Sequence, residues 1–564
     1  MKKLLQLRFF YILVFIFCVC VFSGCDNSLP DNATLKKMAL ENSLKPIKRG
    51  GNGAAYWNKF AKAFMFCPAF DFKKVENATE YEFIAECSDN KIRKFVSSKP
   101  EADLSPIWLD IPTGKVFLSV VAKNNSQTLS IQTREFYKSA SFSGINQKPK
   151  CSYRQSAKKA LKYLFESPMG QCWLKDGKPN LPKTKADDGY WLYCYPSKMG
   201  SKFIDGMLLY AKLEPSAKDD ALKIACKVAD YLISISQPKD APLAFMPPTY
   251  VESIHPIATK YLGENMMIYP AHVGEAYLNL AEETNNKKYF QAAVNIADSY
   301  LKTQLSNGSW YLKIYEKDGK SVDGILMNPV DVLDFLNRIA VLTKNQEYAK
   351  AVLKAEEYAI KTNLKDFVWS GQFEDVEPAA GYKNLSKHPA IRLMLYLMKK
   401  YPDNVELMSQ MRSVADFCED QFVMWESYFG KPEVKKGKLF DKNFTITKWQ
   451  KRFNCDIVYP LAMEQYSYYV PIDASAAALL KMYIAMYKKF GDKLDLAKAH
   501  AFATVITHIQ NPNGSIPTYW GIPRVFSVDH KSQAEGWINC AIATAITQYE
   551  FSKIAESSDV LKQK

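Results

Sequence analysis

Two hydrophobic patterns divide the chain into a strand-rich part and a helix-rich part. In the first, short apolar runs of β-branched and aromatic residues, such as 116–121, are separated by prolines and by a Pro-Thr-Gly turn at 112–114. Such runs are typical of β-strands. From residue 153 onward, apolar positions recur at helical spacing instead. The sequence therefore predicts a β domain over residues 61–145 and a mainly α domain over residues 150–564.

The helical part carries a repeat. An Ala-Asp pair or a close variant, followed by apolar residues, ends one helix and precedes a loop, after which a second, more apolar helix follows. The loops at 307–311 (Asn-Gly-Ser-Trp-Tyr) and 513–520 (Asn-Gly-Ser-Ile-Pro-Thr-Tyr-Trp) are the most alike. Such a repeat predicts that one helical unit is stacked several times. The clearest copies lead to Gln237, Gln304, Gln421 and Gln510.

The repeat and the apolar spacing predict six pairs of helices, which would form a closed ring with the more apolar partners inside. Four partners begin at or near a proline, which suits the first helical turn because its missing N–H loses no hydrogen bond there. An open helical solenoid is the alternative, and the long, uneven loops argue against it. We expect the first helices at residues 153–166, 218–236, 288–304, 348–362, 405–421 and 496–510. We expect their partners at residues 199–211, 270–282, 329–341, 389–400, 471–490 and 534–554.

Two parts of the chain resemble known families. The six hairpins, the Asn-Gly-Ser-Trp type loops and the acidic, aromatic segment 456–470 before Pro471 resemble the six-hairpin glycosidases and the polysaccharide lyases that share their architecture. This resemblance implies an (α/α)6 toroid that binds and cleaves a polysaccharide or oligosaccharide. Residues 77–83 and 111–116 resemble strands of fibronectin-like modules. That likeness implies a small β-sandwich acting as a spacer or binding module.

The start of the chain has the pattern of a secretory signal. Lys2 and Lys3 precede an apolar run over residues 9–22, which is too short for a comfortable membrane span. The run ends in Phe-Ser-Gly-Cys, which resembles a bacterial lipobox. By this resemblance residues 1–24 are a signal peptide and Cys25 carries a lipid anchor. Residues 25–60 would then be a polar tether, and the protein would sit in the cell envelope, in the periplasm or at the outer-membrane surface.

The formal net charge of +15 makes the chain basic, and only three of its positive charges lie in the expected signal. A lipid-anchored envelope protein does not ordinarily meet nucleic acid. An acidic glycan or the anionic membrane surface is therefore the expected partner for the surplus charge, with simple solvation as the alternative.

The cysteines and histidines show no spacing typical of a metal site. Nine cysteines beyond Cys25 are dispersed without a Cys-x-x-Cys pair, and the six histidines include no His-Glu-x-x-His. This pattern argues against a structural zinc site and a disulfide scaffold, although a single bridge such as Cys172 to Cys194 stays open. We expect no metal and no cofactor.

The loops from first helices to partners should gather at one end of the ring, and they are rich in aromatic residues. Flat aromatic faces suit sugar rings, so these loops predict a glycan cleft. Ordinary packing is the alternative for each aromatic. The candidate substrate-binding residues are Tyr190, Trp191, Trp310, Tyr311, Arg452, Tyr469, Tyr519, Trp520 and His530.

Acidic residues in the same loops supply candidates for hydrolysis. Cleaving a glycosidic bond commonly needs one protonated carboxyl group and one carboxylate. The preferred pair is Asp375 with Glu464, from different hairpins, and Asp188 and Asp456 are reserves. Each could instead be a solvated loop carboxylate or a helix cap.

Elimination from a uronate sugar is a second hypothesis, and a glycan-binding lipoprotein without catalysis is a third. A lyase needs a tyrosine or histidine as base and a cation or amide beside the uronate carboxylate. Tyr466, His388 and His272 are the candidate bases, with Arg452 beside the carboxylate. Hydrolysis is expected first because carboxylates outnumber such bases in the loops.

Overall fold

The computed structural model describes residues 29–47, 58, 61–184, 186–375, 384–426, 459–466, 471–520 and 536–555. Both expected domains are represented in these ranges. Within them, no helix is long and apolar enough to cross a membrane. Five candidate positions lie outside the described residues: Cys25, Arg452, Asp456, Tyr469 and His530.

The N-terminal domain is a small β-sandwich. Its larger sheet has the strand order β1-β7-β6-β3-β4, and the short strands β2 and β5 form a second sheet. The sheets share an aromatic core, in which the Phe70 ring lies 5.6 Å from that of Phe136, and Phe72 lies 6.1 Å from Phe83. The strands are β1 (Ala63–Phe64), β2 (Ala69–Asp71), β3 (Glu80–Cys87), β4 (Ile92–Ser97), β5 (Glu101–Asp103), β6 (Gly114–Asn124) and β7 (Gln127–Lys138).

The stretch expected to be a tether contains a helix, α2 (Asn32–Ser43). The Asp31 side chain caps its first turn by accepting from the Thr34 N–H at 2.8 Å. Leu35 and Ala39, four positions apart on one face, are buried, and the helix contacts the helical domain at α16. The polar composition of this stretch comes from its exposed face, which is why its sequence resembles a tether.

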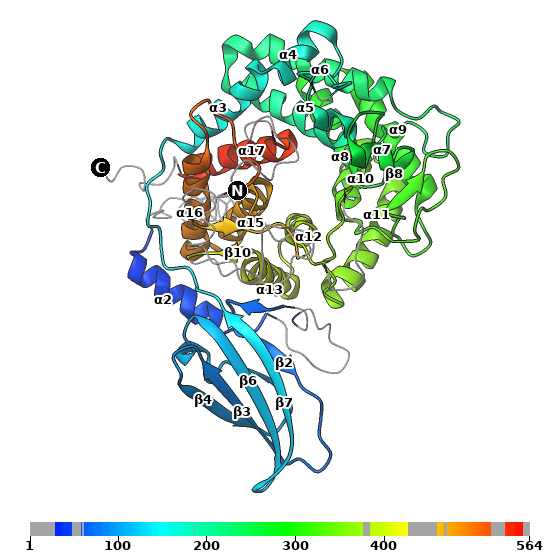
Figure 1. Cartoon of the computed structure of the whole chain (residues 1–564). Coiled ribbons are helices and arrows are strands. Elements are labelled where there is room, and N and C mark those ends of the chain that lie inside the picture. Colours follow the sequence, from blue (N-terminus) through cyan, green and yellow to red (C-terminus); the bar gives the residue numbers. More distant parts are fainter. Residues whose placement is uncertain are drawn as a thin grey trace, which may run out of the picture.

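The helical domain is an (α/α)6 toroid. Its six inner helices contact one another in chain order, and the last of them contacts the first, which closes the ring (Figure 1). The inner helices are α5 (Pro196–Leu213), α8 (Tyr269–Thr284), α10 (Val330–Thr343), α12 (Lys387–Lys400), α15 (Asp473–Phe490) and α17 (Ile538–Ala555). The outer helices are α3 (Tyr153–Glu166), α6 (Lys218–Ser234), α9 (Lys287–Thr303), α11 (Gln346–Ala359), α13 (Val405–Phe422) and α16 (Lys493–Ile509).

The tightest helix pairs differ from those expected. Each inner helix packs most closely against the outer helix that follows it, as α5 does against α6, and α17 packs against α3. The expected pairing joined each outer helix to the next inner one. The reason lies in the connections: the turn between α15 and α16 comprises only Gly491 and Asp492, whereas long loops lead from outer to inner helices. A short connection keeps two antiparallel helices side by side.

Short helices and strands occupy the long loops of the mainly α domain. Strands β8 and β9 pair with each other in the loops before α8 and α10, and β10 and β11 pair in the loop before α15. These short ladders fix the loops that approach one end of the ring. The short helices and strands of these loops are α4 (Pro168–Asp176), α7 (Pro256–Lys260), β8 (Glu264–Met266), β9 (Lys313–Tyr315), β10 (Val423–Met424) and β11 (Leu461–Ala462).

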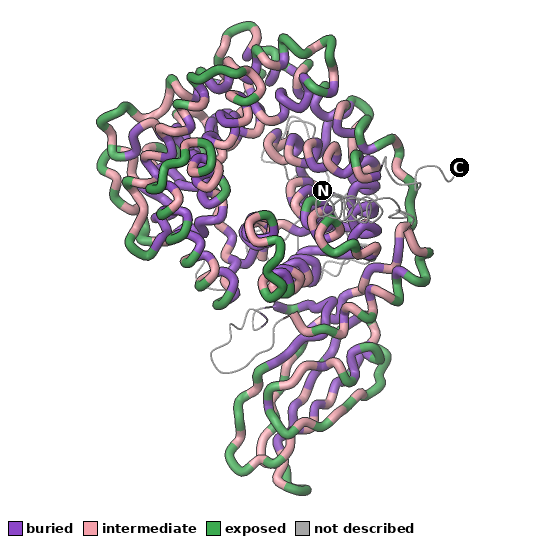
Figure 2. Tube along the Cα trace, turned by 180° about the vertical axis from the view of Figure 1, so that it is seen from behind, coloured by how far each residue is buried: buried purple, intermediate pink, exposed green. Residues whose placement is uncertain are grey.

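The β-sandwich contacts α13 through β1 and projects from one side of the ring (Figure 2). The Asp420 carboxylate, near the end of α13, accepts from the Phe66 N–H at 2.8 Å and also from the Met65 N–H. The rings of Phe142 and Trp425 lie 4.6 Å apart. Buried polar and aromatic contacts therefore join the two domains.

The Asn-Gly-Ser loops are structural turns. Gly308 has φ +90° and Gly514 has φ +96°, a region that favours glycine. The Asn307 side chain accepts from the Ser309 N–H at 3.0 Å, and Gln304 donates to the Gly308 carbonyl at 3.0 Å. A Cβ on Gly308 would meet the Lys354 carbonyl oxygen of α11. The Asn-Gly-Ser repeat is therefore explained by close packing between each loop and a neighbouring helix.

We expect Gly308→Ala to lower the free energy of unfolding by about 2 to 4 kcal/mol, because it adds backbone strain and a clash with an immobile carbonyl. Gly324→Ala is the matched control, since Gly324 also has positive φ (+72°) but no atom within 4 Å of the added Cβ. It should cost about 1 kcal/mol. Urea unfolding of both variants gives the comparison, and equal losses would contradict the role of close packing.

Candidate functional site

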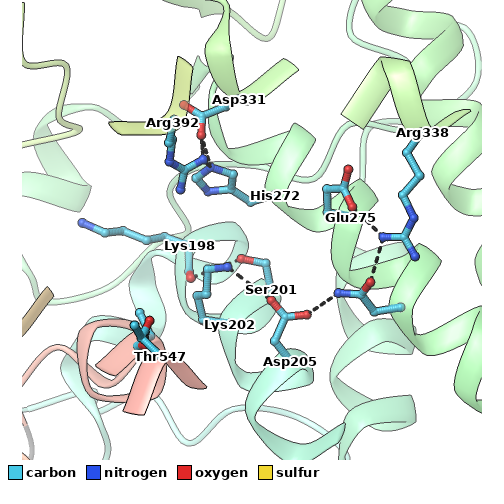
Figure 3. Close-up of polar contacts among 12 residues, drawn as sticks. Lys198, Ser201, Lys202, Asp205, His272, Glu275, Asp331, Arg338, Arg392 and Thr547 are labelled. Carbon is cyan, nitrogen blue, oxygen red and sulfur yellow. Dashed lines mark hydrogen bonds and ion pairs between the residues drawn. The ribbon is translucent and has the colours of Figure 1, made fainter. Parts of the chain in front are cut away.

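The inner helices begin at the same end of the ring. Lys198 in the first turn of α5 lies with its Nζ 5.9 Å from the ring centre of Tyr269, the first residue of α8. His272, in the first turn of α8, lies beside Asp331 in the first turn of α10 and Arg392 in α12 (Figure 3). The long loops before these helices therefore meet at this end, as the sequence predicts.

Glu374 is a fully enclosed acid at this end. Its side chain is fully buried, and its carboxylate accepts from Lys198 Nζ and from the Tyr269 hydroxyl. The Tyr250 hydroxyl donates to its main-chain carbonyl at 2.8 Å. Burial alone would raise the pKa of Glu374, but Lys198 and Tyr269 outweigh it and lower the pKa. Glu374 is therefore held as a carboxylate.

Lys198 completes this ion pair. Its Nζ also lies 4.0 Å from the ring centre of Trp537, just before α17, which is a favourable cation–π distance. Burial opposes the charge, but Glu374 and then Asp375 raise the pKa of Lys198 above its ordinary value. Lys198 and Glu374 thus form a fixed, charged pair between α5 and the loop before α12.

Asp375 differs from its neighbour Glu374. Its side chain has an exposed surface yet is surrounded by protein atoms of the converging loops. Desolvation, and next the negative charge of Glu374, raise the pKa of Asp375 to about 6. A carboxyl group with this pKa exchanges protons near neutral pH.

Glu464 comes from the loop before α15 and is half-buried. Desolvation raises its pKa to about 7; Lys387 opposes this shift and Asp375 adds to it. Lys387, the first residue of α12, is fully buried and donates to the Glu464 main-chain carbonyl at 2.6 Å. Burial lowers the pKa of Lys387 to about 7. Of the two preferred acids from the sequence, Asp375 therefore lies close enough to raise the pKa of Glu464.

His272, Asp331 and Arg392 form a second polar group beside these acids. Nε2 of His272 lies 2.7 Å from Asp331 Oδ1 and 2.8 Å from Arg392 Nη1, and Arg392 also pairs with Asp331. Burial, and then the charge of Arg392, hold the pKa of His272 well below its ordinary value. The neutral form of His272 is therefore favoured, and its Nε2 either donates to Asp331 or accepts from Arg392, depending on the tautomer.

His388 stands apart from such networks. Its main-chain N–H donates to the Ser386 side chain at 3.3 Å as part of a helix cap. Within the described ranges, no hydrogen bond of its imidazole is found, and its ring centre lies 6.4 Å from that of Phe373. Burial, with Lys387 and Lys198 adding to it, keeps the pKa of His388 well below its ordinary value.

Tyr466 and Asp188 contribute less than expected. The Tyr466 hydroxyl donates to Gln421 at 2.5 Å, so this candidate base is bonded to the end of α13. Asp188 is exposed, and its neighbour Asp187 closes a turn by accepting from the Lys183 N–H at 2.7 Å. The turn explains Asp187 without catalysis.

Three of the candidate aromatic residues are packing residues. Trp310 is fully buried and donates to the Tyr300 carbonyl at 2.9 Å. Trp520 is also buried, and Tyr190 is buried with its hydroxyl donating to the Gly536 carbonyl at 2.7 Å. These three have no face for a sugar, which corrects the expectation. The half-buried candidates are Trp191, Tyr311 and Tyr519.

The sequence interpretation missed the basic residues of the site, Lys198, Lys387 and Arg392, together with Tyr269. A signal was present. Lys198 and Lys387 stand in the first turn of helices, where the helix dipole disfavours a cation. A buried lysine in that position points to a carboxylate nearby, which Lys198 has in Glu374.

Among the described residues, no group of three or more His, Cys, Asp and Glu side chains is placed to hold a metal ion. The polar groups of the site are instead carboxylates paired with lysine or arginine. These pairs can bind and orient a polar substrate, and the two acids of raised pKa can exchange protons with it.

Comparisons with known proteins give fold likeness only. No protein-family profile and no curated protein matches the sequence. The GH76 alpha-mannanase of Bacteroides thetaiotaomicron matches with TM-score 0.44 and 10% identity over 72% of this chain and 98% of that chain. The cellobiose 2-epimerase of Spirochaeta thermophila gives TM-score 0.47 and 12% identity over 72% and 98%. An unsaturated glucuronyl hydrolase specific for heparin gives TM-score 0.44 and 10% identity over the same shares. Because each TM-score is below 0.5, these likenesses carry no argument about the reaction of this chain.

Proposed function

We propose that the protein cleaves a glycosidic bond by hydrolysis, with Glu464 as the general acid and Asp375 as the carboxylate that assists attack. One observation supports this above the others: both acids have pKa values raised toward neutrality, while the neighbouring Glu374 is held ionised by Lys198. Environments that separate the pKa values of neighbouring carboxyl groups are how glycosidases assign an acid and a base.

The proposed reaction uses these groups as follows. Glu464, the acid of higher pKa, protonates the leaving oxygen as the bond to the anomeric carbon breaks. The ionised Asp375 either takes a proton from the attacking water or attacks the anomeric carbon itself, depending on its separation from the acid. Lys198 and Glu374 serve as fixed charges that position the loop carrying Asp375.

We propose an acidic glycan as the substrate. Lys198, Lys387 and Arg392 place three basic side chains at the end of the ring where inner helices begin, and helix N-termini add partial positive charge. The basic chain as a whole supports the same choice. The proposed location, the bacterial envelope with a lipid on Cys25, remains a prediction from the first residues of the chain.

Elimination from a uronate sugar is the second candidate, and His388 is the observation that favours it. A neutral histidine without a described hydrogen-bond partner can accept the proton beside a uronate carboxyl group. Arg392 could stabilise the charge on that carboxyl group. Tyr466 is less suited as the base because its hydroxyl is bonded to Gln421.

Mass spectrometry of products separates the two reactions. The signal-free protein is incubated with neutral and uronate-rich glycans, and we expect fragments that together carry one added water per cut. Fragments without added water, one of which has a new double bond absorbing in the ultraviolet, would replace hydrolysis by elimination. Binding without products from any glycan would contradict both and favour a glycan-binding protein.

A further inference from the structure

Glutamines that end the outer helices have a common task in this fold. Gln304, after α9, donates from its amide to the Gly308 carbonyl at 3.0 Å and to the Ala351 carbonyl of α11 at 2.9 Å. Gln510, after α16, donates to the Gly514 carbonyl at 2.7 Å and to the Ser156 carbonyl of α3 at 3.0 Å. Each amide therefore ties the end of its helix to the loop that follows and to the neighbouring outer helix.

Gln421 has the same place in the repeat but different partners. Its amide donates to the Ala63 carbonyl in β1 at 3.0 Å and to the Asp420 carboxylate at 2.6 Å. Its side-chain oxygen accepts from the Tyr466 hydroxyl. Asp420 in turn accepts from the Phe66 N–H. The repeat position that elsewhere joins neighbouring helices here joins the β-sandwich to the loop of Glu464.

The Glu464 segment is held on two sides. On one side, Lys387 donates to the Glu464 carbonyl at 2.6 Å. On the other side, the hydroxyl of Tyr466, which follows Glu464 by two residues, donates to the Gln421 side chain. Strand β11 just before it pairs with β10, and the Met463 N–H donates to the Phe422 carbonyl at 2.8 Å. The direction of the Glu464 side chain is therefore set in part by the end of α13.

We propose that Gln421 is a positioning residue through which the β-sandwich holds the Glu464 segment, so that the N-terminal domain is a working part of the site and not a spacer. The inference rests on the proposed function for its catalytic consequence. Its structural part stands on two hydrogen bonds of the buried Gln421 side chain, which donates to the Ala63 carbonyl and accepts from the Tyr466 hydroxyl.

Amide hydrogen exchange of the full chain tests the structural part without needing activity. We expect Gln421→Leu and Asp420→Asn to speed exchange of the Met463 and Tyr466 amides about fivefold, because each removes buried hydrogen bonds. Tyr466→Phe, a milder change, should do the same if Gln421→Leu folds poorly. Gln304→Leu is the matched control, since it removes an equivalent amide far from Glu464. Unchanged exchange in all three test variants would overturn the inference.

The pH dependence of kcat tests the catalytic part. A loosened Glu464 gains solvent, so its pKa falls from about 7 toward its ordinary value, and the alkaline limb of the profile moves to lower pH. We expect this shift, with kcat lower by on the order of tenfold to a hundredfold, in Asp420→Asn and Gln421→Leu but not in Gln304→Leu. If amide exchange becomes faster but the alkaline limb of the kcat profile does not move, the hydrogen-bonded link through Gln421 stands. The assignment of Glu464 as the general acid is then wrong.

Discussion

Glu464→Gln should lower kcat by on the order of a thousandfold, while substrate binding stays close to that of the wild type. Glutamine keeps the size and polarity of the side chain but has no proton to give the leaving oxygen, and general acid catalysis contributes roughly 10²- to 10⁴-fold. Steady-state kinetics on the glycan cleaved in the product assay give kcat, and calorimetry with the inactive variant gives the affinity.

The pH profile of the wild-type enzyme should be bell-shaped and narrow. Asp375 must be ionised, so activity rises as the pH passes about 6, and Glu464 must be protonated, so activity falls above about 7. Because the two acids interact, the apparent pKa values of the two limbs describe the pair and not either residue alone. Glu252→Gln, at an exposed acid of another loop, is the control and should keep full activity. Full activity in Glu464→Gln would remove this residue from the reaction.

Lys198→Met should be the most destabilising change at the site. It leaves the Glu374 carboxylate buried without its cation, and breaking a buried ion pair in this way costs about 3 to 5 kcal/mol. The double variant Lys198→Met/Glu374→Gln should regain most of the loss, because no unpaired charge remains. Urea unfolding of the two single variants and the double variant gives the coupling energy.

The pH dependence of stability provides a second check on this pair. The lowered pKa of Glu374 contributes stability above about pH 4.5, which is lost as the pH falls through the folded-state value. The raised pKa of Lys198 contributes stability below about pH 10.5, lost as the pH rises. The difference between wild type and Lys198→Met should therefore be largest between these limits. Lys202→Met, which breaks a more exposed pair with Asp205, should cost less, and an equal cost would contradict burial as the cause.

The helices of the ring were predictable because each carries its own local signals. Apolar spacing, prolines near inner-helix starts and the repeated glutamines placed all twelve ring helices near their observed bounds, as for α3 (Tyr153–Glu166). The pairing of helices was wrong because it depends on loop length and packing. The ring is closed by the contact between α17 and α5. The local sequence pattern of a helix carries no information about such a distant contact.

Candidate site residues could be chosen from the sequence where their position in a loop was the deciding feature. Asp375 and Glu464 were chosen because both stand on loops before inner helices, and their roles stay predictions. Three of the aromatic candidates, Tyr190, Trp310 and Trp520, are buried, because loop position does not imply exposure. Trp310 follows a Gly at positive φ and turns into the core, where its indole bonds to Tyr300. Pairs such as Lys198 with Glu374 join residues far apart in the chain, and only the folded ring brings them together.

Closure of the ring by α17 has a consequence for how the toroid assembles. Helix α17 packs against α3 and α5, the first outer and inner helices, so these contacts span nearly the whole helical domain. Contacts so distant along the chain slow folding and leave partly folded species exposed. During synthesis, apolar surface of α3 and α5 would stay uncovered until α17 emerges, as for Tyr153 of α3, whose ring lies 5.2 Å from that of Phe551 in α17. The nascent domain would need protection for most of its translation, and a ribosome stalled before α17 would yield an open, aggregation-prone arc.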